Sequence, residues 1–196
     1  MEAHHEFPNN ALQTGAEESG EELYSIRSHF NGGLHLGKAG RHLLEGGSIA
    51  HNSKEHSISC YEVLVGDSSH ARWVSFPPTW VEILGITPED EKVSPLSLTP
   101  LASPSSLPSF RAPKTIEFPL GASKPAITIS PFCPLEGGFE MSTDGVGSLL
   151  LVTQAPYEGG WHPGHVVVGS DHCCFGWGGG EVWSRNFRVL IWDSPT

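Results

Sequence analysis

The chain has 196 residues, enough for one well-packed core but marginal for two independent ones. Its formal net charge is −11, and its first 25 residues carry six glutamates and no lysine or arginine. Because phosphate and anionic lipid headgroups are bound by clustered positive charge, we expect neither nucleic acid nor a membrane surface as a partner. The 38% hydrophobic content, with 23 glycines and 16 prolines, favours a globular domain built from short elements.

The cysteines and the first residues indicate a cellular compartment. Cys60, Cys133, Cys173 and Cys174 include no CxxC pair, which favours reduced thiols over a disulfide framework. The opening MEAHHEFPNN has neither the basic nor the apolar block of a signal peptide, and no run approaches the roughly 18 apolar residues that span a bilayer. We therefore expect a soluble cytoplasmic protein without a transmembrane segment, and unconventional export stays open.

Short runs of mixed apolar and polar residues predict a β-rich first half. Residues 1–22 are polar and acidic and predict a loop or a short edge strand. Asn31-Gly32 is a strong signal for a tight hairpin turn. Strands are predicted at 23–29, 34–36, 48–50, 60–65, 72–76 and 80–84. Residues 54–56 are predicted to be a polar loop, in which Glu55 satisfies backbone donors or pairs with Arg27.

A proline-rich stretch separates this half from the next. Nine of the sixteen prolines lie between residues 88 and 131. We interpret 85–115 as an insertion or linker, because it offers too little apolar surface to offset the entropy of ordering. Alternating apolar residues within 116–120 and 127–129 predict further strands.

The second half repeats residues of the first in the same order. The matches run from Leu12, Gly15 and Glu17 to Leu135, Gly138 and Glu140; from Tyr24, Gly37 and Lys38 to Leu151, Gly164 and His165; and from Glu55, Tyr61, Val63 and Leu64 to Glu181, Phe187, Val189 and Leu190. This order indicates an internal duplication. We expect an all-β fold in which repeats 1–84 and 116–196 pack as one domain about a pseudo-twofold axis.

The same residues carry a family resemblance. The first copy, through Pro8–Leu12, Gly15–Glu17, Gly37-Lys38, Lys54–His56 and Tyr61–Leu64, resembles the DM-nine repeat. This repeat occurs in tandem in invertebrate mannose-binding lectins and in the recognition part of natterin-like proteins. The resemblance covers about residues 8–84 and 131–193.

The resemblance implies twisted antiparallel sheets and a binding site for mannose or mannose-containing glycans. In the family, an acidic residue near the start of the repeat and the lysine of a turn hold the sugar. These positions are Glu17 and Lys38 here, where the family usually has aspartate in the first place and a proline at the position of Leu36. In the second copy they are Glu140 and His165. No cofactor is implied, and homo-oligomer formation stays open.

Residue chemistry is compatible with this interpretation. A carboxylate accepts hydrogen bonds from two vicinal hydroxyls while an ammonium donates to the same oxygens. The alternative for Glu17 and Lys38 is a solvated ion pair of little energetic value. Tyr24, Trp161 and Trp177 are candidates for an aromatic platform, although such large rings also fill small β cores.

Other classes of function are less favoured by the sequence. It contains neither a GxSxG elbow nor a phosphate-binding loop, since the run Gly176–Gly180 lacks the following lysine and predicts a hairpin turn, so we do not expect an enzyme. No metal site is expected, because neither HExxH nor paired Cys/His spacing occurs. The densest local set of candidate ligands is His162, His165, Asp171, His172 and Cys173. The alternative to a lectin is a protein-interaction or scaffold module that keeps the fold and has lost the sugar site.

Overall fold

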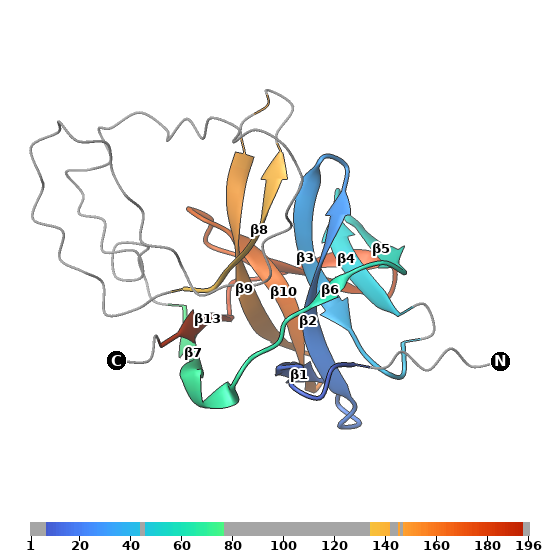
Figure 1. Ribbon diagram of the computed structural model, residues 1–196. Coiled ribbons are helices and arrows are strands. Elements are labelled where there is room, and N and C mark those ends of the chain that lie inside the picture. Colours follow the sequence, from blue (N-terminus) through green and yellow to red (C-terminus); the bar gives the residue numbers. More distant parts are fainter. Residues whose placement is uncertain (1–6, 44–45, 77–133, 142–144, 146, 194–196) are drawn as a thin grey trace, which may run out of the picture.

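The chain folds into antiparallel β-sheet (Figure 1). The computed structural model describes residues 7–43, 46–76, 134–141, 145 and 147–193. These residues form strands and one 3-10 turn, η1 (Ser68–His70), and contain no α-helix. The all-β prediction is therefore confirmed. None of the described residues form a helix long and apolar enough to cross a membrane.

Thirteen strands make up the described part. They are β1 (Gln13–Ala16), β2 (Glu22–Phe30), β3 (Gly33–Ala39), β4 (Gly47–His51), β5 (Lys54–Ile58), β6 (Glu62–Val63), β7 (Ala71–Ser75), β8 (Glu136–Met141), β9 (Gly147–Tyr157), β10 (Gly160–Val167), β11 (Cys173–Trp177), β12 (Gly180–Ser184) and β13 (Arg188–Trp192).

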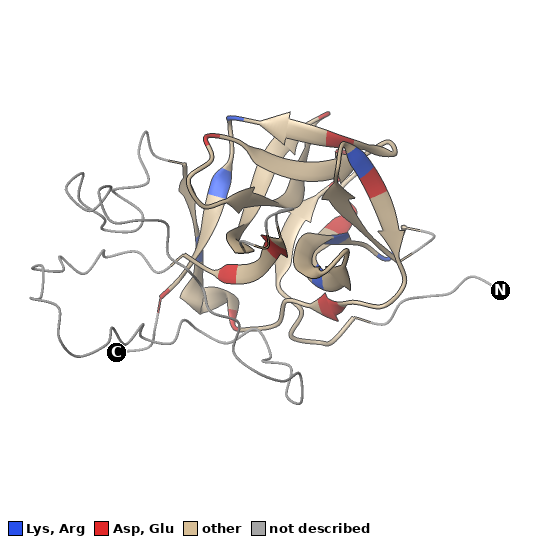
Figure 2. Cartoon of the chain, turned by 90° about the horizontal axis from the view of Figure 1, so that it is seen from above, with Lys and Arg blue, Asp and Glu red and all other residues tan. Residues whose placement is uncertain are grey.

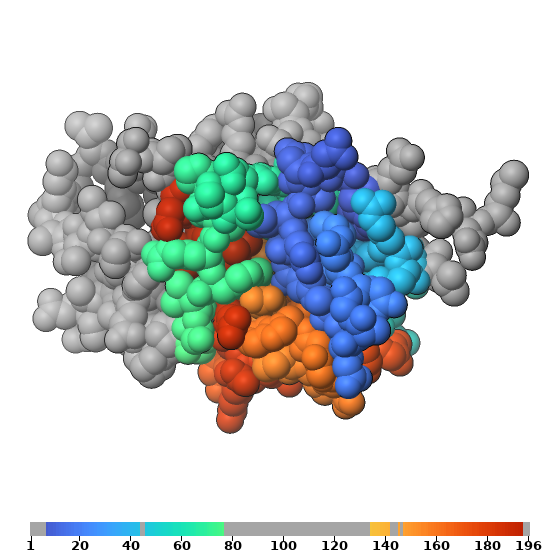
Figure 3. All heavy atoms as spheres, turned by 90° about the horizontal axis from the view of Figure 1, so that it is seen from below, coloured from blue at the N-terminus to red at the C-terminus, as the bar shows by residue number. Residues whose placement is uncertain are grey.

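Eight of these strands close into a ring. Their order is β2-β1-β10-β11-β12-β5-β4-β3, and β3 pairs back to β2. Strands β8, β9, β13 and β7 continue the sheet outward from β3, and β9 also pairs with β10. Seen from below, the blue N-terminal segment therefore lies beside the orange segment that follows residue 134 (Figure 3). Residues from both ends of the sequence share one hydrogen-bonded sheet.

The strand pairings before residue 76 have counterparts after residue 134. Strand β2 pairs with β1, β3 and β6, and β9 pairs with β8, β10 and β13. The register shifts between Gln13 and Gly15 in β1, and between Glu136 and Gly138 in β8. Strands β4 and β5 form one hairpin, and β11 and β12 form another.

Four two-residue turns connect the hairpins. Both residues of each turn have positive φ, which is the type I′ geometry that matches the twist of the strands. The turns are Asn31-Gly32, Asn52-Ser53, Glu158-Gly159 and Gly178-Gly179. The first and last of these were predicted as turns from the sequence, and both predictions are confirmed.

Three apolar clusters form the core. The first contains Leu151, Val166, Phe175 and Phe187, and the second joins Leu12, Leu36 and Leu64 to Leu150 and Leu190. A smaller cluster packs Phe7 on Tyr24, with ring centroids 4.5 Å apart. Because the second cluster takes residues from both ends of the chain, neither end can bury its apolar surface without the other.

The predicted strands at 23–29, 34–36, 48–50 and 72–76 correspond to β2, β3, β4 and β7. Three predictions need correction. Strand β1 lies between β2 and β10 and not at an edge. Residues 54–56 belong to strand β5, whose half-buried Glu55 and His56 hide the apolar alternation expected of a strand. Of the run 60–65, only Glu62–Val63 is a strand. The strand predicted at 80–84, the linker 85–115 and the strands predicted within 116–129 lie outside the described residues.

Charged residues of both signs are distributed over the strands. Blue lysine or arginine segments and red acidic segments both occur on the strands in Figure 2. Arg27 pairs with Glu62 at 2.5 Å, and Arg72 pairs with Asp193 at 2.9 Å. These two arginines of the described part are therefore compensated by acidic partners.

Candidate functional site

The first candidate site, called the first cluster below, consists of Glu17, Lys38, Glu55, His162 and Trp177. Glu17 follows β1, and pairing of Ala16 with Trp161 of β10 brings it beside His162. Lys38 lies on β3 and Glu55 on β5. The sheet thus brings together residues of four strands of the ring, β3, β5, β10 and β11, and the residue that follows β1.

Lys38 is a buried cation. Only 4% of the residue is exposed. Its Nζ lies 3.9 Å from Oε1 of Glu55 and 5.1 Å from the centre of the Trp177 ring. Burial lowers the pKa of Lys38, and the nearby carboxylates of Glu55 and Glu17 oppose that shift. A charge removed from water in this way persists only where partners compensate it.

Glu55 holds the first cluster together. Its Oε1 accepts a hydrogen bond of 2.7 Å from the Ser48 hydroxyl, and its Oε2 accepts one of 2.9 Å from the backbone N–H of Gly179. Gly179 belongs to the turn between β11 and β12, so this carboxylate joins the two ends of the chain. The prediction that Glu55 satisfies backbone donors is confirmed, whereas its pairing with Arg27 is wrong, because Glu62 pairs with that arginine.

Glu17 contacts two histidines. Its carboxylate oxygens lie 3.5 Å from Nε2 of His42 and 3.8 Å from Nδ1 of His162. The Nε2 of His162 lies 3.0 Å from the Tyr157 carbonyl, and the ring is fully buried. Burial, followed by the charge of Lys38, lowers the pKa of His162. Glu17 and Lys38 therefore belong to one electrostatic group, with Glu55 as the nearer carboxylate to Lys38.

A second cluster consists of His35, His51, Glu140, His165 and Glu181. Nδ1 of His51 lies 3.2 Å from Oε1 of Glu140, and the rings of His35 and His51 are 4.6 Å apart. His35, His51 and Glu140 each offer one ligand atom, and these three atoms lie within 4.8 Å of one another. Nitrogen and carboxylate ligands at such spacing can hold a transition metal ion.

His165 lies behind this group. It is fully buried, and its ring is hydrogen-bonded to the backbone of Leu36. Burial, together with the neighbouring His35, lowers the pKa of His165 to about 4. The sequence comparison paired Glu140 with His165. Among the described residues Glu140 instead makes its ion pair with His51, and His165 belongs to the same wider cluster.

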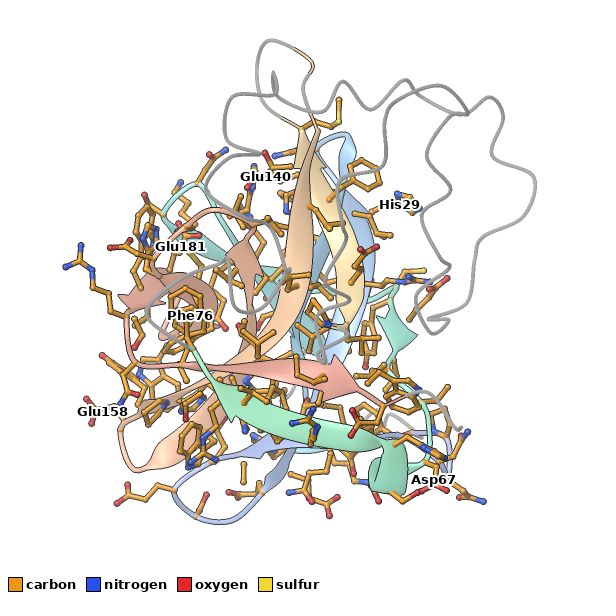
Figure 4. All side chains as sticks on the ribbon, turned by 90° about the vertical axis from the view of Figure 1, so that its left-hand side faces the viewer. His29, Asp67, Phe76, Glu140, Glu158 and Glu181 are labelled. Atoms are coloured by element: carbon orange, nitrogen blue, oxygen red, sulfur yellow. The ribbon has the colours of Figure 1, made fainter. Side chains whose placement is uncertain are left out.

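Glu181 has the same kind of contact here that Glu55 has in the first cluster. It accepts a hydrogen bond of 2.8 Å from the backbone N–H of Ser53, in the turn between β4 and β5. It is also hydrogen-bonded to the Cys174 thiol, whose pKa burial raises to about 12. Glu140 and Glu181 are both labelled in Figure 4, on β8 and β12. The thiol stays protonated because it is buried between these carboxylates.

The remaining candidates from the sequence are separated in space. Tyr24 is in the core, and Trp161 lies 4.0 Å beneath the Arg188 guanidinium. Trp177 is the aromatic candidate that joins the first cluster. The set His162, His165, Asp171, His172 and Cys173 is dispersed, since His172 stacks on Trp183 at 4.5 Å and Cys173 lies in the core.

A hollow of about 290 Å³ lies beside the pairing of Ala16 with Trp161, and no residue of either cluster lines it. It is lined by residues that include Gln13, Trp73, Gln154, Trp161 and Arg188. Its lining has no carboxylate, and Arg188 covers the Trp161 ring. It therefore lacks the pairing of charges that distinguishes the first cluster, and we place the candidate site at the latter.

Sequence reasoning did not single out three of the residues that complete the two clusters as ligands: Glu55, His35 and His51. A signal for the histidines exists in the sequence. The spacing that matches Lys38 with His165 also matches His35 with His162, and the spacing that matches Glu55 with Glu181 matches His51 with Trp177. Extending the internal comparison to these positions would have identified both rings.

No protein-family model matches the chain, and no curated protein matches it. We therefore infer the function from the geometry of the two clusters.

Proposed function

We propose that the protein is a non-catalytic, lectin-like carbohydrate-binding protein, and that its first cluster binds mannose or a mannose-containing glycan. The observation that carries this proposal is Lys38, a buried ammonium 3.9 Å from one carboxylate and within the electrostatic reach of a second. This arrangement goes beyond a surface ion pair, because a lysine at the surface does not need two acids and an aromatic face to hold its charge.

The cluster has the groups that a neutral hexose requires. The carboxylates of Glu17 and Glu55 can accept protons from vicinal hydroxyls, while Lys38 donates to the hydroxyl oxygens. The side chains of these carboxylates are 14% and 16% exposed, so they border solvent while Lys38 lies deeper. The ring of Trp177 adds an apolar face for the C–H side of a sugar.

We also propose that the chain arose by internal duplication and is related to the DM-nine repeat, with residues 1–84 and 116–196 as pseudo-twofold copies. Four matched features support this: the hairpin pairings, the shifted registers in β1 and β8, the four type I′ turns, and the two carboxylates. Glu55 accepts from Gly179, and Glu181 accepts from Ser53, which are equivalent positions in opposite copies.

The sugar proposal is tested by titrating mannose into the full chain, with isothermal calorimetry as the readout. We expect Lys38→Met to weaken binding by about 10- to 100-fold, the value of one charge-assisted hydrogen bond. Glu17→Gln, at a partly exposed carboxylate, is the variant that retains the fold if Lys38→Met does not. Lys54→Met, at an exposed lysine on β5, is the matched control and leaves affinity unchanged. Mannose binding that is equal in all four proteins, or undetectable in the wild type, overturns the proposal.

A second candidate function is a protein-interaction module that keeps the fold without the sugar site. The observation in its favour is Trp183, an exposed side chain on β12 that stacks on His172. Exposed aromatic residues are frequent anchors of protein interfaces. A protein partner that binds Lys38→Met as well as wild type, and is lost with Trp183→Ala, would favour this function. Release of that partner by mannose contradicts it.

A further inference from the structure

We propose that His35, His51 and Glu140 of the second cluster form a binding site for a transition metal dication, with Zn²⁺ as the preferred ion. The site is separate from the first cluster and adds to the proposed sugar-binding function. It is formed by three different strands, β3, β4 and β8, which only the closed sheet brings together.

The spacing of the three ligand atoms fits a zinc ion. They lie within 4.8 Å of one another, and Nδ1 of His51 is already 3.2 Å from Oε1 of Glu140. Ligands at about 2.1 Å in tetrahedral geometry are separated by about 3.4 Å. The contact between Nδ1 of His51 and Oε1 of Glu140 is already close to this separation. The side chain of Glu140 is 34% exposed and can rotate toward an ion.

His35 has a buried ring nitrogen that is available to a metal. Its Nδ1 lacks a hydrogen-bond partner, and its ring lies 4.6 Å from that of His51. Metal-binding histidines commonly donate the other ring N–H to a carbonyl or carboxylate, which fixes the ring and its tautomer.

His51 has a comparable support. Its Nε2 lies 2.9 Å from the side-chain amide of Asn52, so Nδ1 is the nitrogen that faces Glu140. When Nδ1 binds a metal the ring proton is on Nε2, and the amide oxygen of Asn52 can accept it after the amide turns over. The Phe30 ring packs against both histidines, with centroids 6.1 Å from His35 and 5.7 Å from His51. It shields the site from water on one side.

Comparison with the first cluster indicates why the second cluster can bind a metal cation. In the first cluster, Lys38 supplies a positive charge among Glu17, Glu55 and His162. In the second cluster, the internal sequence comparison places His165 opposite Lys38, and Glu140 contacts His51 instead of a lysine. The described residues of this cluster therefore include no lysine or arginine beside Glu140. A bound dication provides that charge.

The ligand set selects the class of metal. Two imidazole nitrogens and one carboxylate suit Zn²⁺ or Co²⁺, whereas Ca²⁺ and Mg²⁺ require a shell of oxygens. Three protein ligands leave a fourth position on the ion. A water molecule or a hydroxyl of a ligand can take that position, which makes the second cluster a separate binding site and not a weakened copy of the first.

The test is a titration of chelator-treated full chain with ZnCl₂, followed by Co²⁺, whose visible absorption reports four-coordinate binding. We expect one ion per chain in excess of any site formed by the adjacent His4 and His5, which His4→Gln with His5→Gln removes. His51→Gln and Glu140→Gln should each weaken binding by at least tenfold. His29→Gln, at an exposed histidine of β2 that is labelled in Figure 4, is the matched control and should bind as wild type.

Several outcomes overturn the proposal. Binding that disappears with His4→Gln and His5→Gln assigns the metal to those residues. Affinity that is unchanged by both His51→Gln and Glu140→Gln, in variants that keep the wild-type circular dichroism, shows that the contact between these two residues is a simple hydrogen bond. Loss of Zn²⁺ binding leaves the mannose affinity of the first cluster unaffected, so failure of this proposal and failure of the sugar proposal are distinguishable.

Discussion

The first and second clusters differ in the source of their positive charge. In the first, Lys38 is held between two carboxylates and its ammonium is part of the chain. In the second, the internal sequence comparison places His165 opposite Lys38, and His35 and His51 beside Glu140 are buried. Under the proposed duplication, this single replacement on a buried strand separates a site that carries its own cation from one that can accept a metal.

The largest expected effect comes from moving the lysine to the other cluster. If the two clusters are equivalent, the lysine introduced by His165→Lys lies near the carboxylates of Glu140 and Glu181. The variant should then fold at pH 7 and lose Zn²⁺ binding. Val166→Lys is the control on the same strand, at a fully buried position in the apolar core. Burying an ammonium there should destabilise the protein by about 4 kcal/mol or more. Urea denaturation measures both free energies of unfolding.

Equal destabilisation by His165→Lys and Val166→Lys would contradict the equivalence. It would mean that Glu140 and Glu181 do not reach the position that Glu17 and Glu55 reach in the first cluster.

Acid should destabilise the folded protein through the buried His165 of the second cluster. The pKa of His165 is about 4 in the folded protein, below its ordinary value of 6.5. Between these values the unfolded chain binds more protons than the folded one, so the stability is complete above pH 6.5 and falls as the pH drops toward 4. The loss for this residue is about 2 kcal/mol between pH 7 and pH 5 and approaches about 3 kcal/mol near pH 4. Urea denaturation with a chelator present, at pH 7 and pH 5, measures the first of these losses.

The comparison variant for the acid effect is His165→Gln, whose amide N–H can still donate to Leu36. It should lose less stability between pH 7 and pH 5 than the wild type, while His29→Gln should follow the wild type. A pH dependence that is the same in all three proteins would assign the acid sensitivity to other groups.

The smallest expected effect is the difference in stability loss between Glu55→Gln and Glu181→Gln, which change the two carboxylates that join the halves. Glu55 accepts hydrogen bonds from Ser48 and Gly179 and also faces Lys38. Glu181 accepts from Ser53 and contacts Cys174, without a cation. We expect Glu55→Gln to lower the free energy of unfolding by about 2 kcal/mol and Glu181→Gln by about 1 kcal/mol, because only the first leaves a buried charge less well paired. A larger loss for Glu181→Gln would contradict this account.

The strands and turns were largely predictable from the sequence. Asn31-Gly32 and the glycines at 178–179 have the residue types that adopt positive φ, and they form the turns that such residues favour. Strand β2 mixes apolar with polar residues and precedes the Asn31-Gly32 turn, and its residues 23–28 are all buried. Strand β5 was missed because Lys54 and Glu55 are polar, and their contacts with a turn of the other half are invisible in a local window. Local patterns therefore miss a strand whose polar residues are buried by contacts with a distant segment.

The sequence by itself determined the all-β class, the hairpin turns and the presence of paired acidic and basic positions at Glu17 and Lys38. The tertiary structure decided which residues meet. Glu55 completes the first cluster because β5 and β12 are neighbours in the closed sheet, and His51 reaches Glu140 because β8 pairs with β3. Pairing of distant strands depends on the burial of apolar residues from both ends of the chain, as in the core cluster of Leu12 with Leu190. Because this burial involves the whole fold, it determines which distant segments are in contact, and local conformational preference does not.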